Sequence, residues 1–239
     1  MALGLFVVQR PILDPVGLGF TLASAAIHVL YFVVLQHGYR LGDLSLVYPI
    51  ARGTGPVLTT IAAIVLLGER PSALALSGAA LVALSVFALA QPPRTSTGDS
   101  RGAVAFGLLT GLLIATYTIC DKQAVGRYGV PPLIQQWGTS LGLTAFLAPV
   151  AVRRRAEVLR RWRSHWREVI GIGVLVPLAY ILVLAAMSFT PVSYVAPARE
   201  VSILFATLMG THLLSEGRSA RRITAAVTMV FGVAALAMG

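Results

Sequence analysis

Charged residues are scarce in this sequence. Of its 239 residues, 12% are Asp, Glu, Lys or Arg and 56% are hydrophobic, and the mean hydropathy is +0.81. Soluble domains carry about 25% charged residues, so this composition excludes that class and indicates an integral membrane protein in a lipid bilayer. The net charge of +10 comes from arginines clustered in short gaps between apolar runs, and we therefore expect no nucleic-acid partner.

Residue types that carry enzyme chemistry are equally few. The single cysteine, Cys120, lies in an apolar run, which excludes a disulfide framework and a thiolate metal site. No glycine-rich phosphate loop follows a strand, and polar residues inside the apolar runs are too dispersed for an enzyme site. We expect no enzyme activity, no metal and no cofactor.

Apolar runs of about 20 residues mark membrane helices. They predict an all-α integral membrane protein with eight transmembrane helices, at 16–36, 44–67, 72–91, 103–123, 132–152, 168–188, 193–214 and 220–238. Residues 1–13 read as the end of a further helix, because they lack the basic region and cleavage site of a signal peptide.

The basic residues set the orientation. Thirteen of them fall in the gaps after the first, third, fifth and seventh helices, against four on the other side. The positive-inside rule then places the amphipathic basic segment 153–167 in the cytoplasm and the C-terminus outside. We expect a multi-pass protein of the cell inner membrane.

The second part of the chain repeats the first. At an offset of 147 residues Arg52 meets Arg199, and Pro49 and Pro197 each lie shortly before their arginine. The copies begin five helices apart, and this odd number gives them opposite topology. Inverted repeats in a membrane chain are typical of transporters with a site at the repeat interface.

A linker rich in Pro, Ser, Thr and Gly at 91–102 divides the chain unequally. The division predicts an incomplete first repeat of three helices in 1–93 and a complete second repeat of five in 101–239. Counterparts of the helices at 103–123 and 132–152 are missing from the first repeat.

These patterns resemble the EamA-type branch of the drug/metabolite transporter superfamily. The resemblance lies in Pro and Arg early in a helix, in Gly68, Glu69 and Arg70 at its end, and in a final helix that contains glycine. The stretches 22–53 and 191–206 resemble members that export amino acids or related metabolites. The resemblance implies ten helices in two inverted repeats around a central cavity, so this chain lacks about two.

Arg52 and Arg199 are the first candidates for the site. Arg52 lies about eight residues into an apolar run, which is roughly 12 Å deep at 1.5 Å per residue. A charged arginine at this depth in a bilayer is energetically unfavourable. Both arginines would bind a carboxylate or phosphate by forked hydrogen bonds. The helix-breaking Pro49 and Pro197 would loosen the helices there. In the structural alternative, the arginines pair with carboxylates and hold helices together.

Three residues are candidates for proton coupling. Glu200 stands where the first repeat has Gly53, and a carboxyl group in a low-dielectric site takes up protons more easily. Asp121 would partner Arg199 or join the coupling, although an interfacial pair beside Lys122 is the reading that we favour. His28 is either a titrating group or a buried, hydrogen-bonded one.

Tyrosines complete the candidate substrate site. Tyr48 shares the face of Arg52 at a spacing of four residues, and Tyr117 shares the face of Asp121 in the same way. Tyr180 lies in the middle of a predicted helix and corresponds to Tyr31 of the first repeat. Interfacial belts use the same residue type, which is the alternative role.

The sequence therefore predicts a secondary transporter, an exporter of small polar or anionic metabolites such as amino acids in exchange for protons. One repeat would rock against the other around a site near Arg52, Tyr180, Arg199 and Glu200. The alternative is a truncated, non-transporting membrane subunit or relic that associates with a second copy or with another chain.

Overall fold

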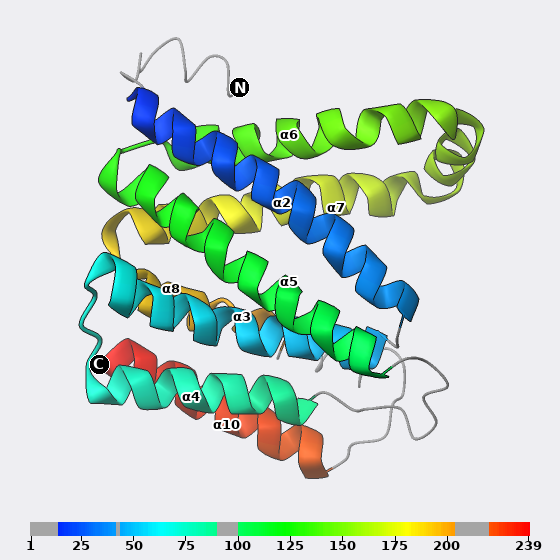
Figure 1. Ribbon diagram of the computed structural model, residues 1–239. Helices are drawn as coiled ribbons and strands as arrows, with labels where there is room; N and C mark the ends of the chain where they lie inside the picture. The colour runs from blue at the N-terminus through cyan, green and yellow to red at the C-terminus, as the bar shows by residue number, and fades with distance from the viewer. Residues whose placement is uncertain (1–13, 42–43, 90–99, 204–219) are drawn as a thin grey trace. The chain divides into compact units, whose positions relative to one another are not determined.

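The computed structural model describes residues 14–41, 44–89, 100–203 and 220–239. Within these ranges the chain is helical and contains no strand. The elements are α2 (Pro15–Leu41), α3 (Leu44–Leu67), α4 (Ala73–Leu89), α5 (Ser100–Lys122), the π-helical turn η1 (Gln123–Arg127), α6 (Pro132–Arg153), α7 (Arg155–Phe189), α8 (Val192–Ala198) and α10 (Ala220–Met238) (Figure 1).

Seven of the eight predicted spans are confirmed as helices over the described residues, and the described part of the span at 193–214 is helical except for a turn at 199–200. Four helical stretches are long and apolar enough to cross a membrane: Pro15–Leu41, Val47–Leu67, Arg101–Arg127 and Arg155–Phe189. Shorter apolar helices cover Ala73–Ala88 and Thr224–Met238. Of the span predicted at 193–214, the part from 204 onward lies outside the described residues, as do residues 1–13.

Two compact units make up the chain, and each is described by itself. The first unit contains the described residues of Met1–Val29 and Cys120–Phe189, and the second those of Leu30–Ile119 and Thr190–Gly239. Each unit therefore holds segments from both predicted repeats. The division into repeats is a property of the sequence and stays a prediction.

Helix α3 runs through two internal prolines, Pro49 and Pro56. Proline lacks an N–H and leaves a carbonyl one turn earlier without its helical partner, yet membrane helices tolerate this where side chains and neighbouring helices compensate. Thr54 and Thr59 each donate to the carbonyl four residues earlier, those of Ile50 at 2.6 Å and Gly55 at 2.8 Å, which are not the carbonyls that the prolines leave free. The loosening predicted at Pro49 does not interrupt the helix.

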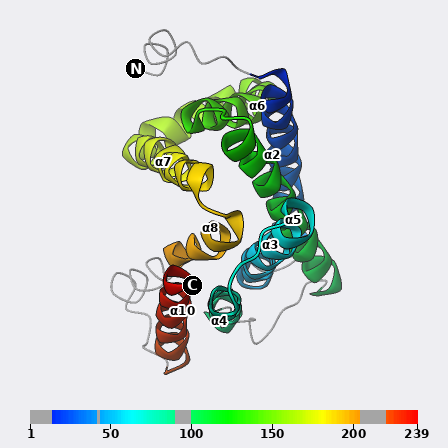
Figure 2. The ribbon, with the colours of Figure 1, turned by 90° about the vertical axis from the view of Figure 1, so that its left-hand side faces the viewer.

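Glycines bring helices of the second unit into close contact. Helices α4 and α10 lie side by side in both views (Figures 1 and 2), and a Cβ placed on Gly78 would lie 2.6 Å from the Gly232 carbonyl oxygen. Helix α5 approaches α3 in the same way, because a Cβ on Gly107 would lie 2.9 Å from Ile50. Small residues at such contacts let backbones approach, which is how helices associate in lipid.

The first unit uses the same packing device. On α6, Gly138 and Gly142 are four residues apart and face Thr21 and Ala25 of α2, which have the same spacing. A Cβ on Gly142 would lie 2.9 Å from the Ala25 Cβ. Because i and i+4 positions share one helix face, the small residues form a continuous contact.

The basic segment 153–167 is almost entirely helical and exposed. It continues from α6 into α7, and the backbone of His165 (φ −136°, ψ 34°) marks a kink where the segment meets the apolar part of α7. Trp162 and Trp166 are half-exposed, and the Arg167 guanidinium lies 5.3 Å from the Trp166 ring centre. Arginine and tryptophan together are typical of a segment at the headgroup level.

Gly232→Ala should destabilise the protein although alanine favours helices. The new Cβ would lie 2.8 Å from the Gly78 carbonyl oxygen and 3.0 Å from the Val82 nitrogen, so α4 and α10 must separate. We expect a loss of about 1–3 kcal/mol, the usual effect of overpacking, measured by thermal unfolding in detergent. The control is Gly173→Ala, where a Cβ meets no atom within 4 Å. Equal unfolding midpoints for the two variants would contradict this packing.

Candidate functional site

A break in the helical path presents two charged residues. Helix α8 ends at Ala198, directly after Pro197, and Arg199 and Glu200 form a turn before helical residues resume at 201–203. Backbone hydrogen bonds here join residues three apart rather than four. The Glu200 N–H donates to the Pro197 carbonyl at 3.0 Å, and the Ile203 N–H donates to the Glu200 carbonyl at 2.9 Å. Interrupted helices of this kind form binding sites in membrane transporters.

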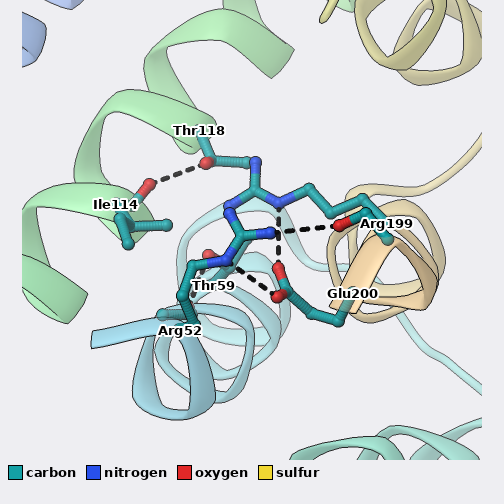
Figure 3. A network of polar contacts seen from close by, with 8 residues as sticks. Arg52, Thr59, Ile114, Thr118, Arg199 and Glu200 are labelled. Carbon is teal, nitrogen blue, oxygen red and sulfur yellow. Dashed lines mark hydrogen bonds and ion pairs between the residues drawn. The ribbon is translucent and has the colours of Figure 1, made fainter. Parts of the chain in front are cut away.

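Glu200 joins the two repeat-related arginines (Figure 3). The Nε of Arg52 lies 3.1 Å from Glu200 Oε2, and the Nε of Arg199 lies 3.4 Å from Oε1, so each carboxylate oxygen faces a different guanidinium. Glu200 is 1% exposed, Arg199 9% and Arg52 22%. The three side chains carry two positive charges and one negative charge, and Arg52 is the member nearest to solvent.

Polar and aromatic side chains surround this Arg–Glu–Arg cluster. The Arg52 guanidinium lies 6.0 Å from the ring centre of Tyr48, which confirms that the two share a helix face. An Arg52 terminal nitrogen is 3.5 Å from the Ser202 hydroxyl. Thr59 and Thr118 flank the guanidinium groups in Figure 3 and bond to carbonyls of their own helices.

Glu69 positions α8 and, through it, the cluster. Its two carboxylate oxygens accept hydrogen bonds from the N–H groups of Val192 and Ser193, at 2.8 and 2.9 Å. These are orphan donors at the N-terminus of α8, where a negative charge also suits the helix dipole. Glu69 therefore connects the end of α3 to the start of α8.

A second polar cluster lies in the first unit around Asp121, which is fully buried. Its Oδ1 accepts hydrogen bonds from the Ser24 hydroxyl at 2.5 Å and from the Gln135 amide at 2.6 Å. Its Oδ2 accepts one from the Tyr180 hydroxyl. The neighbouring Lys122 donates its Nζ to the Met187 carbonyl at 2.7 Å. The interpretation of Asp121 as an interfacial pair beside Lys122 stays a prediction.

The remaining candidates divide between the two units. In the second unit the rings of Tyr31 and Tyr117 meet edge to face, with centres 5.8 Å apart. In the first unit His28 lies 6.0 Å from the Tyr180 ring, and its Nδ1 is 2.9 Å from the Ser24 carbonyl. Arg52, Tyr48, Arg199 and Glu200 thus come together, while Tyr180 belongs to the Asp121 cluster.

The sequence patterns did not indicate two partners of Asp121, Ser24 and Gln135, or the contact of Thr21 with Gln135. The Thr21 hydroxyl donates to Gln135 Oε1 at 2.5 Å and so fixes the orientation of the amide. One signal was present, because Ser24 and His28 are four residues apart in an apolar run. Gln135 gave no local signal, since its role depends on which helix α6 packs against.

Comparison with known proteins gives two positive findings. Residues 101–238 match the EamA-like transporter family. The chain is also similar to a solved protein crystal structure, with a TM-score of 0.78 and 13% sequence identity over 99% of this chain and 83% of that one. At this identity the likeness shows the fold alone. No curated protein matches the sequence.

Glu200→Gln should destabilise the protein by about 3 kcal/mol, since it leaves two guanidinium groups facing a neutral amide in a buried site. The measurement is thermal or denaturant unfolding in detergent. Glu157→Gln is the matched control, because Glu157 is 49% exposed and lies 4.0 Å from Arg154. Adding Arg52→Gln to the Glu200 variant should recover part of the loss. Equal losses of stability in Glu200→Gln and Glu157→Gln would show that the cluster does not contribute this stabilisation.

Proposed function

Because this chain belongs to the EamA-like transporter family, we propose that it moves small metabolites with an anionic group across the membrane. Amino acids and related zwitterions are the class that we favour, with export as the direction and the cell inner membrane as the location. The transport cycle would be alternating access, in which the two repeats rock around the substrate.

The observation that carries this proposal is the Arg–Glu–Arg cluster. Arginine presents planar, forked donors that match a carboxylate, and buried charges need partners when no substrate is bound. Glu200 provides such a partner, because one carboxylate faces both Arg52 and Arg199. In the empty transporter Glu200 then takes the place of the substrate carboxylate.

Substrate would enter at the more exposed arginine. Arg52 is 22% exposed and its Nε lies 3.1 Å from Glu200 Oε2, whereas its terminal nitrogens extend the donor face on which an incoming carboxylate would bind. Two guanidinium groups repel an ammonium group, so an amino acid would bind with its carboxylate first. Tyr48, which is 40% exposed and faces Arg52, would border the side chain of the substrate.

The structural alternative uses the same contacts differently. Arg52 and Glu200 join α3 to the segment after α8, as a static ion pair would. A static pair tolerates replacement by any well-packed pair of similar volume, whereas substrate binding requires the guanidinium itself. An arginine-to-lysine substitution distinguishes the static pair from substrate binding, because it keeps the positive charge and removes the forked guanidinium donors.

Arg199→Ala should abolish flux while the protein still inserts into the membrane, since it removes one of the two donors for the substrate carboxylate. Arg199→Lys should insert normally and retain less than about a tenth of the flux. The assay is exchange of isotope-labelled L-amino acids and short monocarboxylates in proteoliposomes. Arg155→Ala, an exposed position in the basic segment, is the control and should transport normally. Normal flux in Arg199→Ala would refute the role of this residue, and no flux in the unaltered protein would favour the non-transporting subunit.

The orientation is tested with single cysteines in a Cys120→Ser background. Ala156→Cys in the exposed basic segment should react with a membrane-impermeant maleimide in inverted vesicles and stay unlabelled in intact cells. Arg70→Cys, in the exposed connection between α3 and α4, should show the opposite pattern. Labelling of Ala156→Cys from outside intact cells would reverse the proposed topology.

A further inference from the structure

We propose that the basic segment 153–167 binds the headgroup of an anionic phospholipid, and that Arg160 and Arg163 hold its phosphate. Lipid binding at this place does not depend on the proposed transport function. The segment joins α6 to the apolar part of α7, and these two helices lie against each other (Figure 1). All of the residues concerned belong to the first unit and to one continuous stretch of chain.

The charge of the basic segment is strongly one-sided. It contains seven arginines and one carboxylate, that of Glu157, which lies 4.0 Å from an Arg154 guanidinium nitrogen. All seven arginines are exposed. Clusters of arginine next to a membrane helix attract anionic lipids, because the positive charges lie at the depth of the lipid phosphates. Charge complementarity therefore favours an anionic occupant.

Two of the arginines share a helix face with an open hollow. The residues that line this hollow are Ala156, Leu159, Arg160, Arg163 and Ser164. They follow one another at intervals of three and four residues or lie side by side, so they form one face of the first turns of α7. Arg155 and Arg161 belong to the same helix and do not line the hollow. The hollow thus selects two arginines out of seven.

The guanidinium groups supply the hydrogen-bond donors of the hollow. Their forked N–H groups match the oxygens of a phosphate in geometry as well as in charge. Ser164 has another task, because its hydroxyl donates to the Arg160 carbonyl at 3.0 Å. A serine that bonds to the carbonyl four residues earlier often bends a helix, and the non-helical backbone of His165 follows directly. The kink gives the helix before His165 a direction different from that of the apolar part of α7.

Apolar side chains border the hollow and distinguish a lipid from a soluble anion. Leu159 lines the hollow and is 53% exposed, and Val158 and Trp162, which share a helix face with it, are each 47% exposed. Such side chains gain free energy when acyl chains replace water around them. The apolar part of α7 that follows the segment is almost entirely exposed as well. A phospholipid places its phosphate on the arginines and its hydrocarbon on these apolar side chains.

Tryptophan fluorescence can measure lipid binding at this site. The chain has three tryptophans, and Trp137→Phe leaves Trp162 and Trp166, which both lie in the basic segment. The full-length variant is placed in phosphatidylcholine nanodiscs that contain a brominated lipid, either anionic phosphatidylglycerol or zwitterionic phosphatidylcholine. Bromine quenches a tryptophan in its vicinity. We expect stronger quenching by the brominated phosphatidylglycerol at equal mole fraction, and equal quenching by the two lipids would overturn the proposal.

Two double variants with the same loss of charge separate a site from general attraction. In the Trp137→Phe background, Arg160→Gln combined with Arg163→Gln should lower the association constant for phosphatidylglycerol by about fivefold or more. Arg155→Gln combined with Arg161→Gln should lower it by less than about twofold. The measurement is made in about 0.15 M salt, where exposed charges more than about 8 Å from a phosphate are largely screened. Equal losses in the two double variants would show attraction by charge alone and would refute the site.

Soluble anions are tested as competitors in the same nanodiscs, where both faces of the bilayer are accessible. Inorganic phosphate or a short single-stranded RNA, compared with sodium chloride at equal ionic strength, should leave the quenching by brominated phosphatidylglycerol unchanged. Neither competitor brings hydrocarbon to Leu159 and Trp162. Relief of the quenching by either one would assign the hollow to a soluble anion and overturn the lipid assignment. These measurements need no flux, so they can fail while the Arg–Glu–Arg cluster binds substrate as proposed.

Discussion

Glu200 holds two guanidinium groups at a break in a helix, and the charged interior of the second unit depends on this interaction. Lipid does not solvate a charge, so an arginine well inside an apolar run needs a carboxylate as an ion-pair partner. The carboxylate comes from a turn that Pro197 and the tightened backbone bonds create. Glu69 in turn fixes the start of α8. The contacts of Glu69 and the turn after Pro197 therefore place Glu200 between the two arginines, of which Arg52 is the more exposed.

The first unit also buries an ionisable side chain, but surrounds it with different partners. Asp121 is buried, and three neutral donors from three other helices surround it. Glu200 thus lies between opposite charges, whereas Asp121 is held by hydrogen bonds from neutral groups. The two clusters thus suit different tasks. For the arginine-rich one we propose the binding of an anion.

Much of the fold was predictable because membrane helices obey a simple rule. Every backbone polar group must be satisfied within its segment, so apolar runs of about 20 residues become helices almost independently of context. The confirmed helices follow the predicted spans closely, and the shared face of Tyr48 and Arg52 follows from helical spacing. The side-chain partners were harder to predict. Nothing nearby in the sequence indicates that Ser24, Gln135 and Tyr180 converge on Asp121.

The sequence by itself determined the class of the protein, the position of its helices and the correspondence of Arg52 with Arg199, because composition, run length and repetition are local or linear properties. Tertiary structure alone decided that both arginines face Glu200 and that four helices meet at Asp121. Such pairings depend on which helix faces approach each other. In lipid that choice is made by small residues such as Gly78, Gly138 and Gly232, where backbones come close enough for polar side chains to meet.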